Sequence, residues 1–322
     1  MTTTNDLALE ISEIKQTHVD EDRARRPVTE NPKNESVRRQ SRAAWMFLAI
    51  PLLFFAVFVI IPLLLAVGTS FTDYSIVSAP HWIGLANFRA VLSDSFFWVA
   101  MRNTVYYTAV YVPLGLVVSF GTALLLNRRT WSAKVFRTLF YIPVVSSSVA
   151  TATIWVWVLN KDKGMLNMVL GWFHINGPNW LNDSQWAMFA IILMSIWAGF
   201  GVNMIIFLGG LQSVPVDLRE AAKLDGANWW QIVWNVVIPS IRPTMFLVTM
   251  QLIIGSFQVF DQAYLLTGGG PGNATITIVY YIYNSGFGSL KMGYASALSF
   301  VLFAIILVFS LINMHFTDKE ES

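Results

Sequence analysis

Residues 220–239 read EAAKLDGANWWQIVWNVVIP, a polar stretch that separates two long apolar runs. Pro215, shortly before it, favours the first turn of a helix, where the missing amide donor costs nothing. Gly226 favours the end of that helix, because glycine adopts positive φ without strain. The pair Ala221 and Ala222 leaves one face of the helix nearly bare. The stretch therefore predicts a short helix between two membrane spans, with a face that another protein's backbone can approach closely.

The composition indicates a membrane protein. Of the 322 residues, 55% are hydrophobic and 12% are charged, whereas soluble globular proteins carry about 25% charged residues. The net charge of +2 offers no argument for a nucleic-acid partner. The chain has no cysteine, which excludes disulfides, thiolate metal sites and cysteine nucleophiles.

Six apolar runs are long enough to cross about 30 Å of hydrocarbon as helices. The first follows a long polar segment, too late for a cleavable signal peptide, and is expected to remain as a span. We therefore expect an all-α membrane protein with six transmembrane helices in a permease domain covering residues 44–316. The runs are residues 44–68, 103–126, 137–159, 186–211, 243–266 and 292–314.

Basic residues set the orientation of these spans. With the N-terminus inside, eleven basic residues fall on inner segments near the membrane and five on outer loops. The positive-inside rule therefore places the N-terminus and the loop of residues 212–242 in the cytoplasm. Residues 1–43 are rich in charge and poor in aromatic side chains, so we expect a disordered cytoplasmic tail. Residues 317–322 would form a short cytoplasmic tail at the other end.

The spacing within residues 220–239 resembles the EAA loop of ABC importer permeases. Three residues separate E-A-A from Gly226 and nine more precede V-V-I-P; Val236 and Ile238 stand where that family usually has Ile and Leu. In the family this loop forms the coupling helix, which docks into a cleft of the cytoplasmic ATPase. The resemblance implies a coupling role for Glu220, Ala221, Ala222, Asp225, Gly226 and Pro239.

Three further stretches resemble the maltose- and glycerol-3-phosphate-type branch of the same family. They are GLANF (84–88), FRTLFYIPVVSSSVA (136–150) and FDQAYLLTGGGPG (260–272), the last with the F-D-x-x-Y-x-L-T-x-G-G-P pattern of the first-permease type. The resemblance implies a maltose-permease-like fold in the inner membrane of a bacterium or archaeon, and import of a sugar. It implies as partners a second homologous permease, two ATPase subunits that bind MgATP and an extracytoplasmic solute-binding protein. It implies no cofactor or metal in this chain.

Polar side chains in the fifth run mark a candidate solute path. Asp261 is the only acidic residue within the six runs, and an intramembrane charge marks a polar path or a paired structural site. On one continuous helix a row of amides shares a face that Asp261 borders. Amides suit sugar hydroxyls, and the rings of Phe257, Phe260 and Tyr264 offer flat apolar surface; the same amides also serve to hold helices together. The candidate pathway residues are Gln251, Phe257, Gln258, Asp261, Gln262 and Tyr264.

Three alternatives stay open. A secondary transporter driven by an ion gradient would want paired intramembrane ionisable groups, whereas the runs hold only Asp261. An integral-membrane enzyme would need clustered His, Asp or Glu, and no nucleophile stands beside a base, so we expect no covalent chemistry. Import of glycerol 3-phosphate would favour a basic residue in the path. None lies in the interior of a span, which favours a neutral di- or oligosaccharide.

The GGGPG stretch (268–272) is expected to form a turn, because a phosphate-binding loop would need a Gly-Lys pair and the chain has none.

Overall fold

The computed structural model describes residues 45, 47–128 and 130–321, with side chains up to residue 311. The predicted tail at residues 1–43 lies outside the described residues. The chain forms two compact units, Met1–Leu65 and Ala66–Ser322. Within the described residues the only β-type pairings are two isolated bridges in the loop of residues 72–82.

Four straight helices are long and apolar enough to cross a membrane. Two further helix pairs qualify together but are bent, α6 with α7 by 103° and Trp229–Ser240 with α13 by 77°. Counted as one span each, they bring the described residues to six spans, and the predicted all-α membrane fold is confirmed. The four straight spans are Phe47–Ser70, α5 (Ser95–Leu126), α9 (Ala187–Ser213) and the Met292–Leu311 part of α16 (Met292–Glu321).

The remaining helices are shorter or belong to the bent pairs. They are η1 (Ala56–Ile60) and α3 (Ile61–Ser70) within the first span, α4 (Ala86–Ser93), α6 (Trp131–Val145), α7 (Ser148–Val158), α8 (Met165–Trp172), α10 (Val216–Leu224), α11 (Trp229–Ile232), η2 (Val233–Val237), α12 (Ile238–Ser240), α13 (Arg242–Phe257), α14 (Asp261–Leu266), α15 (Ile278–Tyr283) and η3 (Asn284–Gly288).

Two of the predicted continuous helices are broken. In the third run the extended backbone of Ser146 and Ser147 separates α6 from α7. In the fifth run α13 ends at Phe257 and α14 begins only at Asp261. The sixteen residues of α13 rise about 24 Å as a helix, too little to cross the hydrocarbon alone. Residues 229–240, which the sequence placed in the loop, join α13 to make a pair of sufficient length.

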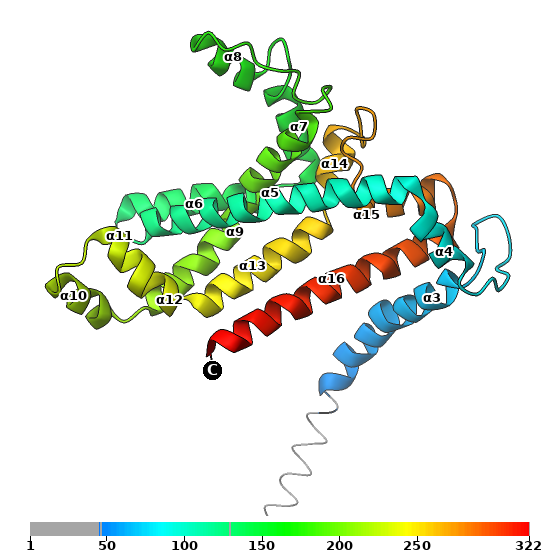
Figure 1. Ribbon diagram of the computed structural model, residues 1–322, viewed down its shortest axis with the longest axis horizontal. Coiled ribbons are helices and arrows are strands. Elements are labelled where there is room, and N and C mark those ends of the chain that lie inside the picture. Colours follow the sequence, from blue (N-terminus) through cyan, green and yellow to red (C-terminus); the bar gives the residue numbers. More distant parts are fainter. Residues whose placement is uncertain (1–44, 46, 129, 322) are drawn as a thin grey trace, which may run out of the picture. The chain divides into compact units, whose positions relative to one another are not determined.

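The second unit is built around α5. It lies beside α9, and α13 packs against both. Figure 1 shows the segment from α10 to α12 at one end of α5 and α14 with α15 toward the other. Helix α6 approaches α9 closely at Gly201, where an added Cβ would stand 2.2 Å from the carbonyl oxygen of Phe140. A side chain there would force the two helices apart.

The GLANF stretch stabilises the turn that follows the first span. Asn87, at the start of α4, is buried. Its amide nitrogen donates to the carbonyl oxygens of Ser70 at 2.9 Å and Thr72 at 2.8 Å. Because a helix end leaves carbonyl groups without intrahelical partners, Asn87 supplies the donors that the end of α3 lacks.

Candidate functional site

The segment around Glu220 folds as the sequence predicts. Helix α10 follows Pro215 and ends before Gly226, which has a φ of +81°. The amide of Gly226 donates to the carbonyl of Lys223 at 3.0 Å, and that of Ala227 to the carbonyl of Ala222 at 2.9 Å. This pair of bonds is a Schellman motif, the common way in which a glycine ends a helix. The helix and its glycine turn are confirmed, while the docking role stays a prediction.

A second local motif turns the chain back toward the spans. The side chain of Asn228 accepts from the amide of Gln231 at 2.9 Å, and the side chain of Gln231 accepts from the amide of Asn228 at 2.7 Å. This reciprocal capping box begins α11 and satisfies two amides that the helix leaves open. Pro239 lies just after the π-helical turn η2, within the helix Trp229–Ser240. The whole segment is therefore held by contacts between near neighbours.

The two alanines lie on different faces of α10. Ala222 is half-buried and packs against the hydrophobic core at this end of the unit. Ala221 is exposed, on a face with Leu218 (50% exposed) and Leu224 (89% exposed). The prediction of a bare face built from both alanines is therefore wrong for Ala222, because its methyl group already has a partner. Glu220 and Asp225 are exposed.

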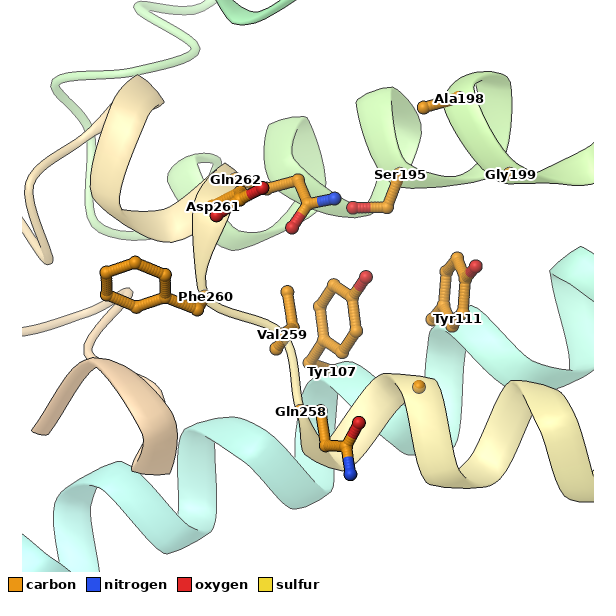
Figure 2. A pocket seen from close by; sticks show the side chains of 11 residues that line it. Tyr107, Tyr111, Ser195, Ala198, Gly199, Gln258, Val259, Phe260, Asp261 and Gln262 are labelled. Carbon is orange, nitrogen blue, oxygen red and sulfur yellow. The ribbon is translucent and has the colours of Figure 1, made fainter. Parts of the chain in front are cut away.

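A cavity of about 460 Å³ lies where the fifth run breaks. Figure 2 shows it between α5, α9, α13 and the start of α14. Gln258 is the first residue of the break, directly after α13, and Asp261 and Gln262 open α14. The lining residues are Tyr107, Tyr111, Ser195, Ala198, Gly199, Gly255, Gln258, Val259, Phe260, Asp261 and Gln262.

Hydroxyl and amide groups gather on one side of this cavity. In Figure 2 the amide of Gln262 and the hydroxyl of Ser195 point toward one another from α14 and α9, with the hydroxyl of Tyr107 close to both. Ser195 also donates to the carbonyl of Ile191 at 2.8 Å. The rings of Tyr107 and Tyr111 are stacked with centroids 5.1 Å apart. Such a wall offers hydrogen bonds to a polyhydroxylated ligand and flat apolar surface beside them.

The structure divides the predicted pathway residues. Gln258, Asp261 and Gln262 line the cavity, while Gln251 is exposed elsewhere on α13. Gln251 lies seven positions before Gln258, about 10 Å further along α13, and the break places Gln262 on a separate helix, so the three amides do not form one continuous row. Phe257 and Tyr264 do not line the cavity either.

The two aromatic exceptions have different surroundings. Phe257 is 2% exposed and packs against Phe309 at 5.4 Å between ring centroids. A ring enclosed in the core offers no face to a solute, so the structure contradicts the pathway prediction for Phe257. Tyr264 is 44% exposed and stacks on Phe260 at 5.3 Å, next to the cavity wall.

Three polar lining residues were not among the candidates from the sequence. Tyr107 and Tyr111 belong to α5 and Ser195 belongs to α9. The only signal was a polar group within an apolar run, with the tyrosines four residues apart and therefore on one helix face. That pattern does not tell a cavity from a helix contact.

Asp94 ties the start of α5 to two other helices. Its carboxylate accepts from the hydroxyls of Tyr281 on α15 and Tyr294 on α16, the latter at 2.6 Å. Partial burial raises the pKa of Asp94, but the bonds from these hydroxyls and from the amides of Phe96 and Phe97 outweigh burial and hold the pKa below its ordinary value of 3.8. Asp94 is thus a structural anion outside the cavity. No three His, Asp or Glu side chains come together as metal ligands in the described part of the chain.

The sequence as a whole identifies the family. Residues 112–320 match the family described as "Binding-protein-dependent transport system inner membrane component". The chain belongs to this family. It is 33% identical to the probable ABC transporter permease protein YesP of Bacillus subtilis, over 90% of this chain and 97% of that protein. It is 32% identical to the probable starch degradation products transport system permease protein AmyD of Thermoanaerobacterium thermosulfurigenes, over 86% and 94%.

Solved structures agree with this assignment at the level of the fold. A chain of a bacterial alginate ABC transporter, crystallised with its alginate pentasaccharide-bound periplasmic protein, superimposes with a TM-score of 0.77 and 24% identity, over 88% of this chain and 96% of that one. This member of the binding-protein-dependent inner membrane components is therefore a multi-pass membrane protein and a permease of the carbohydrate ABC importer type.

Proposed function

We propose that this permease carries a neutral di- or oligosaccharide across the cytoplasmic membrane. The cavity at the break between α13 and α14 carries the proposal. Its polar lining consists of amides, hydroxyls and one carboxylate, with no Lys or Arg. Sugar hydroxyls both donate and accept hydrogen bonds, so they are matched by Gln258, Gln262 and the half-buried Tyr111. The similarity to a permease for starch degradation products supports the same solute class.

The energy would come from outside this chain. The exposed face of α10 with Leu218, Ala221 and Leu224 suits docking into an ATPase cleft, because exposed apolar patches mark interaction sites. Two cytoplasmic ATPase subunits would themselves bind MgATP, and a second homologous permease would complete the path. The family description supports a solute-binding protein as the donor of substrate. This chain would bind no cofactor of its own and catalyse no covalent step.

The orientation is part of the same proposal. An inside N-terminus puts the loop of residues 212–242 and both predicted tails in the cytoplasm. A cysteine introduced at Thr130 should then resist an impermeant reagent in intact cells. Rapid labelling of Thr130→Cys would show that residue 130 lies outside the cell and would contradict the proposed orientation.

Co-purification followed by reconstitution tests the proposal. The tagged chain should bring an ATPase and a second permease with it. Vesicles holding the assembly and its solute-binding protein should take up a neutral oligosaccharide in an ATP-dependent way that an ionophore does not abolish. Uptake driven by an ion gradient without an ATPase would establish the secondary transporter instead. Uptake of glycerol 3-phosphate in place of sugars would overturn the neutral-sugar assignment.

A further inference from the structure

An apolar groove lies at the end of α5 nearest α10. It has a volume of about 590 Å³, and its walls come from α5, from the segment of residues 229–238 and from α13. Three tryptophans line it, with exposed fractions of 54% for Trp229, 64% for Trp230 and 63% for Trp234. Its described walls carry no charged side chain. Tryptophan is enriched where spans meet the membrane–water interface.

A second, charged hollow adjoins this groove. It measures about 450 Å³ and is lined by Arg128, Arg219 and Lys223 together with Glu220. Four residues line both hollows, namely Leu124, Leu125, Trp229 and Val233. Three cations against one carboxylate leave the charged hollow with a formal excess of two positive charges. An apolar groove and a basic hollow therefore lie side by side and share one wall.

The cations in this hollow are not neutralised by the protein. None of the three forms an ion pair with a carboxylate of the described residues. Arg219 donates from one terminal nitrogen to the carbonyl of Val214 at 3.2 Å. Its Nε is buried without a hydrogen-bond partner in the described structure. That donor is closed to solvent, so the argument for a ligand rests on the charge of the lining: the excess of basic residues favours an anion that supplies acceptors.

We propose that the two hollows form one binding site for an anionic phospholipid. The acyl chain occupies the groove beneath the three tryptophans. The phosphate accepts hydrogen bonds among Arg128, Arg219 and Lys223. A zwitterionic lipid would fill the groove equally well but would bring no net charge to the cations, so the site selects for the anionic headgroup.

The position of the site gives the lipid a role beyond filling a surface. Arg128 follows α5, whereas Arg219 and Lys223 belong to α10. A phosphate between them bridges the docking helix to a membrane span and restrains its direction. Occupancy of the site therefore raises the coupling between ATP hydrolysis and transport. This consequence, unlike the binding itself, rests on the proposed function.

Lipid retention by the assembled, detergent-purified transporter tests the proposal. Native mass spectrometry compares phosphatidylglycerol with phosphatidylcholine of the same acyl chains. The wild type should retain phosphatidylglycerol preferentially, and the preference should fall about fivefold for each of Arg128→Gln, Arg219→Gln and Lys223→Gln. Lys223 and Arg128 are exposed, so these two variants keep the test valid if Arg219→Gln fails to fold.

A further variant tests the contribution of the apolar groove independently of the charged residues. Gly121 lines the groove, and an added Cβ there meets nothing within 4 Å. Gly121→Leu should therefore fill the groove and abolish retention of both lipids without disturbing the fold. Gly209→Leu on α9 is the matched control, since its Cβ also meets nothing and it lines neither hollow. It should retain lipid as the wild type does.

Three outcomes would overturn the proposal. The first is equal retention of the two lipids by the wild type. The second is unchanged phosphatidylglycerol in Gly121→Leu. The third is a disulfide between Trp230→Cys and a cysteine of a second permease subunit in the assembled transporter, which would put a protein in the groove. None of these readouts uses transport, so they are independent of the identity of the solute.

Discussion

The proposed docking segment and the proposed solute cavity lie at different places along α5 and are built in opposite ways. The docking segment occupies one continuous stretch, residues 215–240, and its turns are satisfied by partners three to five positions away. The cavity draws on α5, α9, α13 and α14, so that Tyr107 and Gln262 stand 155 positions apart (262 − 107). A local motif can be recognised in the sequence, because the residues that complete it are near neighbours in the chain. A cavity cannot be recognised in this way, because each helix contributes only a few of its lining residues.

The largest effect is expected from a substitution that disturbs the docking segment alone. Gly226→Val places a β-branched residue at a φ of +81°, although a Cβ there meets no atom within 4 Å. The strain is therefore purely local, of about 1–3 kcal/mol, and redirects α10 while leaving the cavity intact. We expect ATPase attachment, or the coupling of hydrolysis to transport, to be lost in co-purification and uptake assays.

Two further variants should have smaller coupling defects than Gly226→Val. Gly226→Asn should retain most coupling, because asparagine tolerates positive φ. Glu220→Lys should show a milder defect, since one contact changes and the helix remains. Normal coupling in Gly226→Val would mean that this segment is an ordinary connector.

The cavity is tested by removing its amides. Gln258→Leu and Gln262→Leu should each weaken sugar transport about three- to tenfold, the loss expected for one hydrogen bond to a neutral group. Assembly and basal ATPase activity should stay near wild type. Gln251→Leu is the control, because Gln251 lies on α13 but outside the lining. Equal losses in all three variants would restore the single row of amides, and loss of assembly before transport would make them helix contacts.

Ala221 and Ala222 allow the exposed and the core-facing sides of α10 to be tested separately. Ala222→Leu adds three carbons against a packed core and should lower the free energy of unfolding by about 1–3 kcal/mol. Ala221→Leu, on the exposed face, should change stability by less than about 0.5 kcal/mol yet weaken ATPase attachment. Thermal unfolding and co-purification measure the two effects separately. The reverse pattern would mean that α10 presents its other face to the partner.

The smallest effect is expected at Asp94, which anchors the start of α5 and belongs to neither the docking segment nor the cavity. Asp94→Asn removes a charged acceptor from Tyr281 and Tyr294, and should lower the unfolding midpoint by roughly 2–4 °C at neutral pH. The lowered pKa of Asp94 means that its contribution is present above about pH 4 and is lost as the pH falls toward the folded-state pKa. The variant should lack this acid-dependent loss. An identical decline in both proteins between neutral and acid pH would contradict the structural role of Asp94.

The helical class, the number of apolar runs and the turn at Gly226 could all be predicted from the amino-acid order. Each of these depends on hydrophobic length or on a residue whose backbone preference acts locally. The packing of the helices was needed to show that the fifth run breaks after Phe257 and that Ala222 faces the core while Ala221 does not. It also showed that Tyr107, Tyr111 and Ser195 line one cavity with Gln262. In a continuously apolar chain the helical period carries little contrast, because lipid and core both accept the same side chains. Which face turns inward, and where a helix opens to leave a cavity, is then set by close contacts such as that of Gly201 with Phe140.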